Sequence, residues 1–144
     1  MRGMTLIVKT VARGMAGIIF LYGIYIILHG HLTPGGGFAG GVVVCAAFIL
    51  VFLAKGSTEG VSDVRKWRSS VAESLGIFAF WALAIIGLIG GSFFLYNFLT
   101  KGSPFRLLSA GFMPLSNIAI GVEVAGALFA IFVTLAVLKT GEKK

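Results

Sequence analysis

Four side chains in this sequence carry reactive groups within or beside long apolar runs. Glu123 lies several residues inside the apolar run 115–138. If this run spans a membrane, an isolated charged carboxylate there costs several kcal/mol. His29 and His31 flank a glycine at the end of another apolar run, and Cys45 sits within VVVCAAFIL. A lone thiol in such surroundings is expected to be a buried structural group. The carboxylate and the imidazoles are therefore the groups that could carry protons or cations.

Two interpretations of Glu123 are open. As part of a pathway it would pass protons or cations, the usual role of an ionisable residue inside a membrane span. As a structural group it would form a buried ion pair that fixes helix register. Arg13 is the basic partner if the first and last apolar segments pack with an offset, and Asn117 would extend a polar stripe on the same helix. The ion-pathway candidates are thus Glu123, His31, His29, Asn117 and Arg13.

The two histidines also have two interpretations. Imidazoles change charge near neutral pH, so the pair would suit proton transfer or sensing. At a helix end, however, histidines more often hydrogen-bond the last carbonyls, and we favour this second role. No carboxylate or cysteine lies in the same turn to complete a ligand set, so no metal site is expected.

The elements that must position these groups are four apolar segments. The chain has 144 residues, of which 58% are hydrophobic and 12% charged, whereas about a quarter are charged in soluble proteins. A membrane-spanning helix needs about 20 apolar residues. Spans are expected at about 5–28, 37–54, 71–99 and 115–138. The sequence predicts an all-α integral membrane protein with four transmembrane helices that form one membrane domain over residues 1–144.

The basic residues predict the orientation of the spans. If all four segments cross, the N-terminus, the loop 55–70 and the C-terminus share one side with ten of the 12 Lys and Arg residues. The ten are Arg2, Lys9, Arg13, Lys55, Arg65, Lys66, Arg68, Lys139, Lys143 and Lys144. Cytoplasmic loops carry such an excess, so both termini are expected in the cytoplasm of a multi-pass cell-membrane protein. The net charge of +7 then reports topology, and no nucleic acid is expected as a partner.

The stretch HGHLTPGGGFAGG (29–41) is expected to form a membrane hairpin. Proline ends the first helix, and the following glycines turn the chain at little steric cost. Glycines then repeat at four-residue spacing, a pattern that lets another helix pack closely. Alternatively, a broken helix could aim its N–H groups at an anion or line a cavity. The helix-packing motif comprises Pro34, Gly35, Gly36, Gly37, Phe38, Gly40 and Gly41.

Three stretches together resemble a known family: GHLTPGGGFAGG, the basic loop, and NIAIGVE in the fourth span. The sequence is similar over essentially its whole length to the MnhB family, whose members are small subunits of the multisubunit Mrp-type Na+/H+ antiporters. The resemblance implies a four-span subunit of a hetero-oligomeric complex, in which large subunits conduct protons and small ones help form the sodium route. The motif residues that match are Gly30, His31, Pro34, Gly35, Gly36, Gly37, Phe38, Gly40 and Gly41.

The resemblance leaves three functions to compare. The first is a non-catalytic subunit of a Na+/H+ antiporter that contributes to the cation pathway and to assembly. The second is a subunit of the ion-translocating module of a ferredoxin-driven membrane-bound hydrogenase or sulfur-reducing complex, since relatives occur there. The third is a scaffold alone. The expected partners are other membrane subunits, the lipid bilayer, and Na+ and H+ as transported ions. No enzymatic activity and no cofactor are expected, because no nucleophile with an adjacent base is visible and the loops are short.

Overall fold

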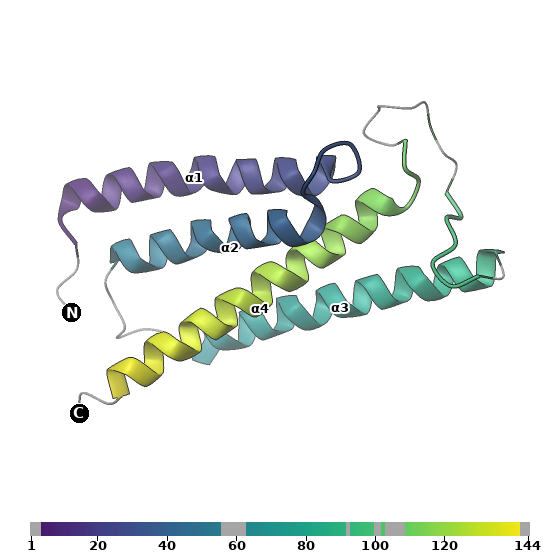
Figure 1. Cartoon of the computed structure of the whole chain (residues 1–144). Coiled ribbons are helices and arrows are strands. Elements are labelled where there is room, and N and C mark those ends of the chain that lie inside the picture. Colours follow the sequence, from purple (N-terminus) through teal and green to yellow (C-terminus); the bar gives the residue numbers. More distant parts are fainter. Residues whose placement is uncertain (1–3, 56–62, 92, 100–101, 103–108, 142–144) are drawn as a thin grey trace.

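The structure, a computed structural model, describes residues 4–55, 63–91, 93–99, 102 and 109–141. Its helices are α1 (Leu6–His29), α2 (Gly36–Lys55), α3 (Asp63–Gly91) and α4 (Met113–Gly141) (Figure 1). They contain 24, 20, 29 and 29 residues. At a rise of about 1.5 Å per residue each is at least about 30 Å long, the thickness of a bilayer's hydrocarbon core. All four are long and apolar enough to cross a membrane, which confirms the predicted all-helical fold.

The ends of the first two helices follow from local chemistry. The side chain of Thr5 accepts a hydrogen bond from the N–H of Val8 (3.5 Å) and caps α1. At the other end, the N–H groups of Leu32 and Thr33 both donate to the carbonyl of His29, at 2.8 and 2.9 Å. After Pro34 the chain reverses through Gly35 and Gly36, whose φ angles of 152° and 87° suit glycine alone.

The helices pack in a row in the order α1, α2, α4, α3. α1 and α2 form an antiparallel hairpin, α2 also packs on α4, and α4 packs on α3. α1 meets α4 over a shorter stretch, and within the described residues α3 contacts no helix besides α4. Figure 1 shows both ends of the chain at one end of the bundle, and the α1–α2 turn at the other. This is the arrangement expected when every helix crosses once.

The core lies where α2 meets α1 and α4. Cys45 is 2% exposed and Val133 is fully buried. Phenylalanine rings from the three helices meet edge to face, with ring centroids 5.7 Å apart for Phe20 and Phe48 and 6.2 Å for Phe48 and Phe129. In the apolar span of α2, 44% of the residues are buried, against 17% in that of α3. The outer faces of α3 therefore remain for lipid or for another subunit to cover.

The third helix differs from its predicted span of 71–99. It begins at Asp63, so the residues just before 71 are helical, and it ends at Gly91. Two glycines end the helix, and a turn follows in which Leu95 has a φ of 61°. The chain then folds back: a Cβ added at Gly87 would lie 2.9 Å from the backbone N of Tyr96. The apolar pattern continued to residue 99, although the helix had ended and Phe93 and Phe94 are 72% and 62% exposed.

The described part of the connection between α3 and α4 is tied to the start of α4. The side-chain amide of Asn97 donates to the carbonyl of Ala110 (3.1 Å), and its oxygen accepts from the N–H of Phe112 (3.2 Å). Gly111, between these two partners, has a φ of 64°. The rings of Phe98 and Phe112 stack with centroids 6.2 Å apart. One half-buried amide thus fixes the entry to α4.

Candidate functional site

Glu123 lies at the contact between α3 and α4. It faces Gly76 so closely that a Cβ at Gly76 would lie 2.7 Å from both the Cβ and the backbone N of Glu123. About one turn away, the glycine belongs to α4 and the glutamate to α3. A Cβ at Gly126 of α4 would lie 2.9 Å from the backbone N of Glu73 of α3. Each helix thus places a glycine against the glutamate of the other.

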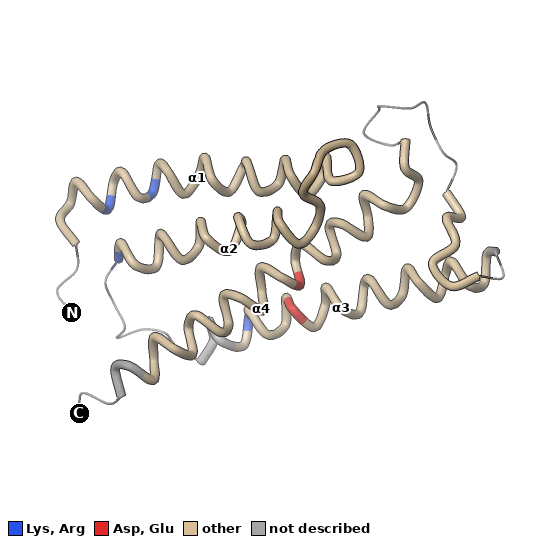
Figure 2. The backbone as a smooth tube through the Cα atoms, viewed as in Figure 1, with Lys and Arg blue, Asp and Glu red and all other residues tan. Residues whose placement is uncertain are grey.

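The two glutamates are therefore neighbours along this contact. Because each glutamate is three residues from the glycine on its own helix, the pair is offset by about one turn, or about 4.5 Å along the axis. Figure 2 shows the two acidic positions on adjacent segments of α3 and α4. Both residues are half-buried. We call Glu73, Gly76, Glu123 and Gly126 the glutamate–glycine contact.

Glu73 was not among the predicted site residues. A third span that began at 71 put it at the inner boundary, but α3 begins at Asp63, about 15 Å of helix earlier. The candidate span of α3 runs from Trp67 to Gly90, so Glu73 lies about 9 Å along the helix from its start. A signal was present in the sequence: the spacing Glu-x-x-Gly occurs in both helices, as ESLG and EVAG. Glu123 is therefore one of two glutamates at this contact, together with Glu73.

Two carboxylates within a membrane contact limit the chemistry available there. A charge at this depth is costly without a partner, and ionisable groups in spans pair, bind cations or carry protons. The glycines allow the two backbones to approach without filling the space beside the carboxylates with side chains. The glutamate–glycine contact therefore brings two ionisable side chains to the packing surface of one pair of helices.

Arg13 does not meet Glu123, so the predicted pairing of the two is wrong. The contact of α1 with α4 places Ile27 against Gly121, where an added Cβ would lie 2.7 Å from Ile27 Cδ1. Measured along the helix axis, Arg13 lies about 21 Å from Ile27 of α1, whereas Glu123 lies about 3 Å from Gly121 of α4. Arg13 is also exposed. The offset between the helices is therefore too large for an ion pair.

Asn117 does not share a face with Glu123 either, so the predicted polar stripe is wrong. Six residues of α-helix turn the side chain by about 240°. Asn117 accordingly lies against the α1–α2 hairpin: a Cβ at Gly30 would lie 2.8 Å from its Nδ2, and one at Gly37 would lie 2.5 Å from its carbonyl oxygen. Asn117 belongs to the hairpin packing and Glu123 to the glutamate–glycine contact.

The hairpin glycines face two different helices of this chain. Gly40 lies against α1, where an added Cβ would be 2.9 Å from the carbonyl oxygen of Gly23. Gly41 lies against α4, at 2.7 Å from the carbonyl oxygen of Gly121 by the same measure. The four glycines of α2 are all buried: Gly36, Gly37, Gly40 and Gly41. Their spacing thus serves close approach on both sides of α2.

The remaining hairpin residues lie at its surface. Pro34 and Gly35 are exposed, and Phe38 points away from the bundle with 66% of its side chain exposed. His29 stacks on Tyr25, with centroids 4.2 Å apart, and its Nδ1 lies 3.2 Å from the carbonyl oxygen of Tyr25. That geometry fits the helix-end role. His31 is half-buried in the turn, about two turns of α4 from the level of Glu123.

The anion-binding alternative for the hairpin has no support in this geometry. It required a broken second helix, yet α2 is continuous over 20 residues from Gly36 to Lys55. The space at its start is taken by Asn117, whose Oδ1 would lie 3.7 Å from a Cβ at Gly36. Within the described residues, no three His, Cys, Asp or Glu side chains gather in a way that could hold a metal ion.

Four helices long and apolar enough to cross a membrane, with two glutamates at the contact of the last two, define a helical membrane protein. Comparison with protein families agrees: residues 7–138 match the family described as "Domain related to MnhB subunit of Na+/H+ antiporter". The chain belongs to this MnhB family.

Two individual relatives show how much of the chain is matched. A putative antiporter subunit mnhB2 of Staphylococcus aureus (strain Newman) is 36% identical over 69% of this chain and 62% of its own length. An uncharacterized protein of Methanocaldococcus jannaschii is 35% identical over 86% of this chain and 49% of its own. The chain thus spans from about half to under two thirds of the length of these relatives.

A solved structure shows the same fold in another setting. It is a chain of the membrane-bound sulfane sulfur reductase, described as an archaeal respiratory membrane complex. The match has a TM-score of 0.77 and 32% identity, and it covers 94% of this chain and 59% of the other. The fold of the MnhB family therefore occurs both in antiporter subunits and in a respiratory complex.

Proposed function

We propose that this chain is a non-catalytic membrane subunit of a multisubunit Na+/H+ antiporter, where it contributes to the cation pathway and to assembly. The observation that carries this proposal is the glutamate–glycine contact, which holds Glu73 and Glu123 about one turn apart inside two apolar helices. Membership of the MnhB family supports the antiporter setting.

The physical reason lies in the cost of burying charge. Two carboxylates near each other in a membrane are stable when a proton or a cation lies with them, and each such ion lowers the cost for the other group. Ions can then enter and leave in exchange, which is the elementary step of antiport. The rest of the pathway would come from neighbouring subunits, because four spans are too few to build alternating cavities alone.

Substitution of the two glutamates tests the pathway. Glu123→Gln and Glu73→Gln keep the size of each side chain and remove its charge, so each is expected to abolish most Na+/H+ exchange while the complex still assembles. Exchange is measured as sodium-dependent pH change in inverted membrane vesicles, and assembly by copurification. Ser74→Ala is the matched control, because Ser74 neighbours Glu73 but is exposed. If both Gln variants kept full Na+/H+ exchange, the cation-pathway role would be excluded and the scaffold role would remain.

The likeness to the respiratory complex supports a second candidate function. In this alternative the chain belongs to the ion-translocating module of a ferredoxin-driven hydrogenase or sulfur-reducing complex. Mass spectrometry of the complex purified through a C-terminal tag separates the two. Antiporter-like subunits without redox proteins would favour antiport, and iron–sulfur or nickel–iron partners would favour a redox-driven pump.

The orientation of the chain is part of the proposal. Figure 2 shows the described Lys and Arg residues of α1, α2 and α3 gathered toward the end of the bundle that carries both termini. Cytoplasmic segments are enriched in these residues. We therefore place both termini in the cytoplasm and the chain in the cell membrane.

A further inference from the structure

A deep apolar groove runs along α4 between the α1–α2 hairpin and α3. Its volume is about 870 Å³, in the range of about 300–1,000 Å³ that small-molecule sites occupy. The groove exists because α3 packs on α4 without touching α2 in the described residues, which leaves the space above α4 open. Its lining includes the phenylalanines Phe20, Phe48 and Phe129 and small residues such as Ala125.

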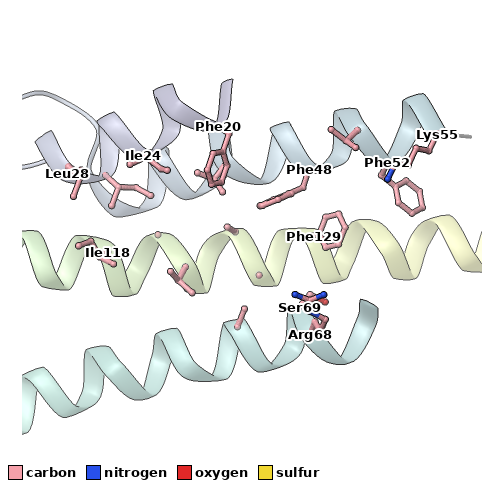
Figure 3. Close-up of a pocket in the computed structure, with 18 residues that line it drawn as sticks. Phe20, Ile24, Leu28, Phe48, Phe52, Lys55, Arg68, Ser69, Ile118 and Phe129 are labelled. Carbon is pink, nitrogen blue, oxygen red and sulfur yellow. The ribbon is translucent and has the colours of Figure 1, made fainter. Parts of the chain in front are cut away.

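The charges of the groove lie at one end. Among the described residues that line it, the charged side chains are Lys55, from the end of α2, and Arg68, from the start of α3. Figure 3 shows them on opposite sides of α4, at the end of the groove away from Leu28 and Ile118. Both side chains are exposed. This end is also the one where both termini of the chain lie (Figure 1).

We propose that the groove binds an anionic phospholipid, with the phosphate at the end that carries Lys55 and Arg68 and an acyl chain along the phenylalanines. Inside a bilayer any acyl chain can fill an apolar groove, because lipid tails are as apolar as the groove itself. Selection of an anionic lipid therefore depends on the two basic side chains, Lys55 and Arg68. Basic pockets between membrane helices at the cytoplasmic side bind anionic head groups in this way. This inference is independent of the ion pathway.

Lipid competition measures how strongly the groove prefers the anionic phosphatidylglycerol to phosphatidylcholine. The full chain carries a reporter tryptophan, Phe48→Trp, with Trp67→Phe and Trp81→Phe to remove its own tryptophans. It is reconstituted in phosphatidylcholine vesicles that contain phosphatidylglycerol, and either lipid is brominated on its acyl chains to quench the reporter. Stronger quenching by the brominated phosphatidylglycerol is expected. Equal quenching by both lipids would overturn the proposal.

Variants assign the preference to the two cations. Because each basic residue near the membrane surface contributes about 1 kcal/mol toward anionic lipid, Lys55→Ala or Arg68→Ala should lower the preference about fivefold and the double variant about 30-fold. Lys9→Ala removes a charge that does not line the groove and should change nothing. Ala125→Phe keeps both cations but fills the groove, so it should reduce quenching even if the double variant fails to fold.

The occupant in the assembled complex is identified by photo-crosslinking. Benzoylphenylalanine replaces Phe48 in the complex within native membranes, and the adduct is analysed by mass spectrometry. An adduct with an anionic lipid supports the proposal. An adduct with another polypeptide would overturn it and show that a partner helix fills the groove.

Discussion

Asn97 bridges the segment after α3 and the start of α4 with a single side chain. Its amide bridges the carbonyl of Ala110, which also accepts from the N–H of Met113, and the N–H of Phe112 just before α4. Nothing in the sequence pattern singles it out, because its partners are 13 and 15 residues away in the chain. Contacts over such separations are decided by the fold.

Replacement of Asn97 tests this bridge. Asn97→Ala is expected to lower the free energy of unfolding by about 1–3 kcal/mol, since it removes the side-chain acceptor of the Phe112 N–H and one of the donors to the Ala110 carbonyl. Asn97→Asp still accepts from the N–H of Phe112 and should lose less. Unfolding of the purified chain in sodium dodecyl sulfate measures both values. If the Ala variant were as stable as the parent, the bridge would have no structural role.

Glycines decide how the helices meet. The four-residue spacing in the hairpin predicted close helix contacts, but only the structure assigns Gly40 to α1 and Gly41 to α4. The helix ends also divide into those that the sequence predicted and those that only the structure shows. Proline and the glycine run set the end of α1 and the start of α2 within a residue or two, whereas apolar pattern alone extended the third span to 99.

A pair of alanine substitutions isolates the effect of glycine packing. Gly41→Ala places a methyl group 2.7 Å from the carbonyl oxygen of Gly121, so it should destabilise the chain by about 1–3 kcal/mol. Gly17 of α1 has nothing within 4 Å of its added Cβ. Gly17→Ala should therefore be neutral or stabilising by up to about 1 kcal/mol. Equal effects of the two substitutions in the same unfolding assay would contradict close packing of α2 on α4.

As a whole, the molecule is an open row of helices. α3 is held by α4 alone within the described residues, and much of its surface is large and apolar, with Trp81 56% exposed and Phe78 64% exposed. Such faces need lipid or other subunits to cover them. This openness is consistent with a subunit of an assembly, and it is what leaves the groove along α4.

Cysteine labelling tests the orientation of the whole chain. Thr33 is exposed in the α1–α2 turn, and the native Cys45 is 2% exposed. Thr33→Cys should therefore react with a membrane-impermeant maleimide added to intact cells, while a C-terminal tag stays protected until the membrane is opened. The parent chain, with Cys45 alone, is the control. Labelling of Thr33→Cys only after lysis would reverse the proposed topology.

Composition and hydropathy by themselves determined that the chain is helical, that it has four spans and where the hairpin lies, because a bilayer requires continuous apolar helices of a set length. They also marked Glu123 as a costly residue. Only the tertiary structure decided which groups meet. It separated Arg13 and Asn117 from Glu123, and it brought Glu73 beside that residue instead. The reason is geometric: the rotation and offset of one helix against another depend on small contacts such as Gly76 and Gly126, which hydropathy does not record.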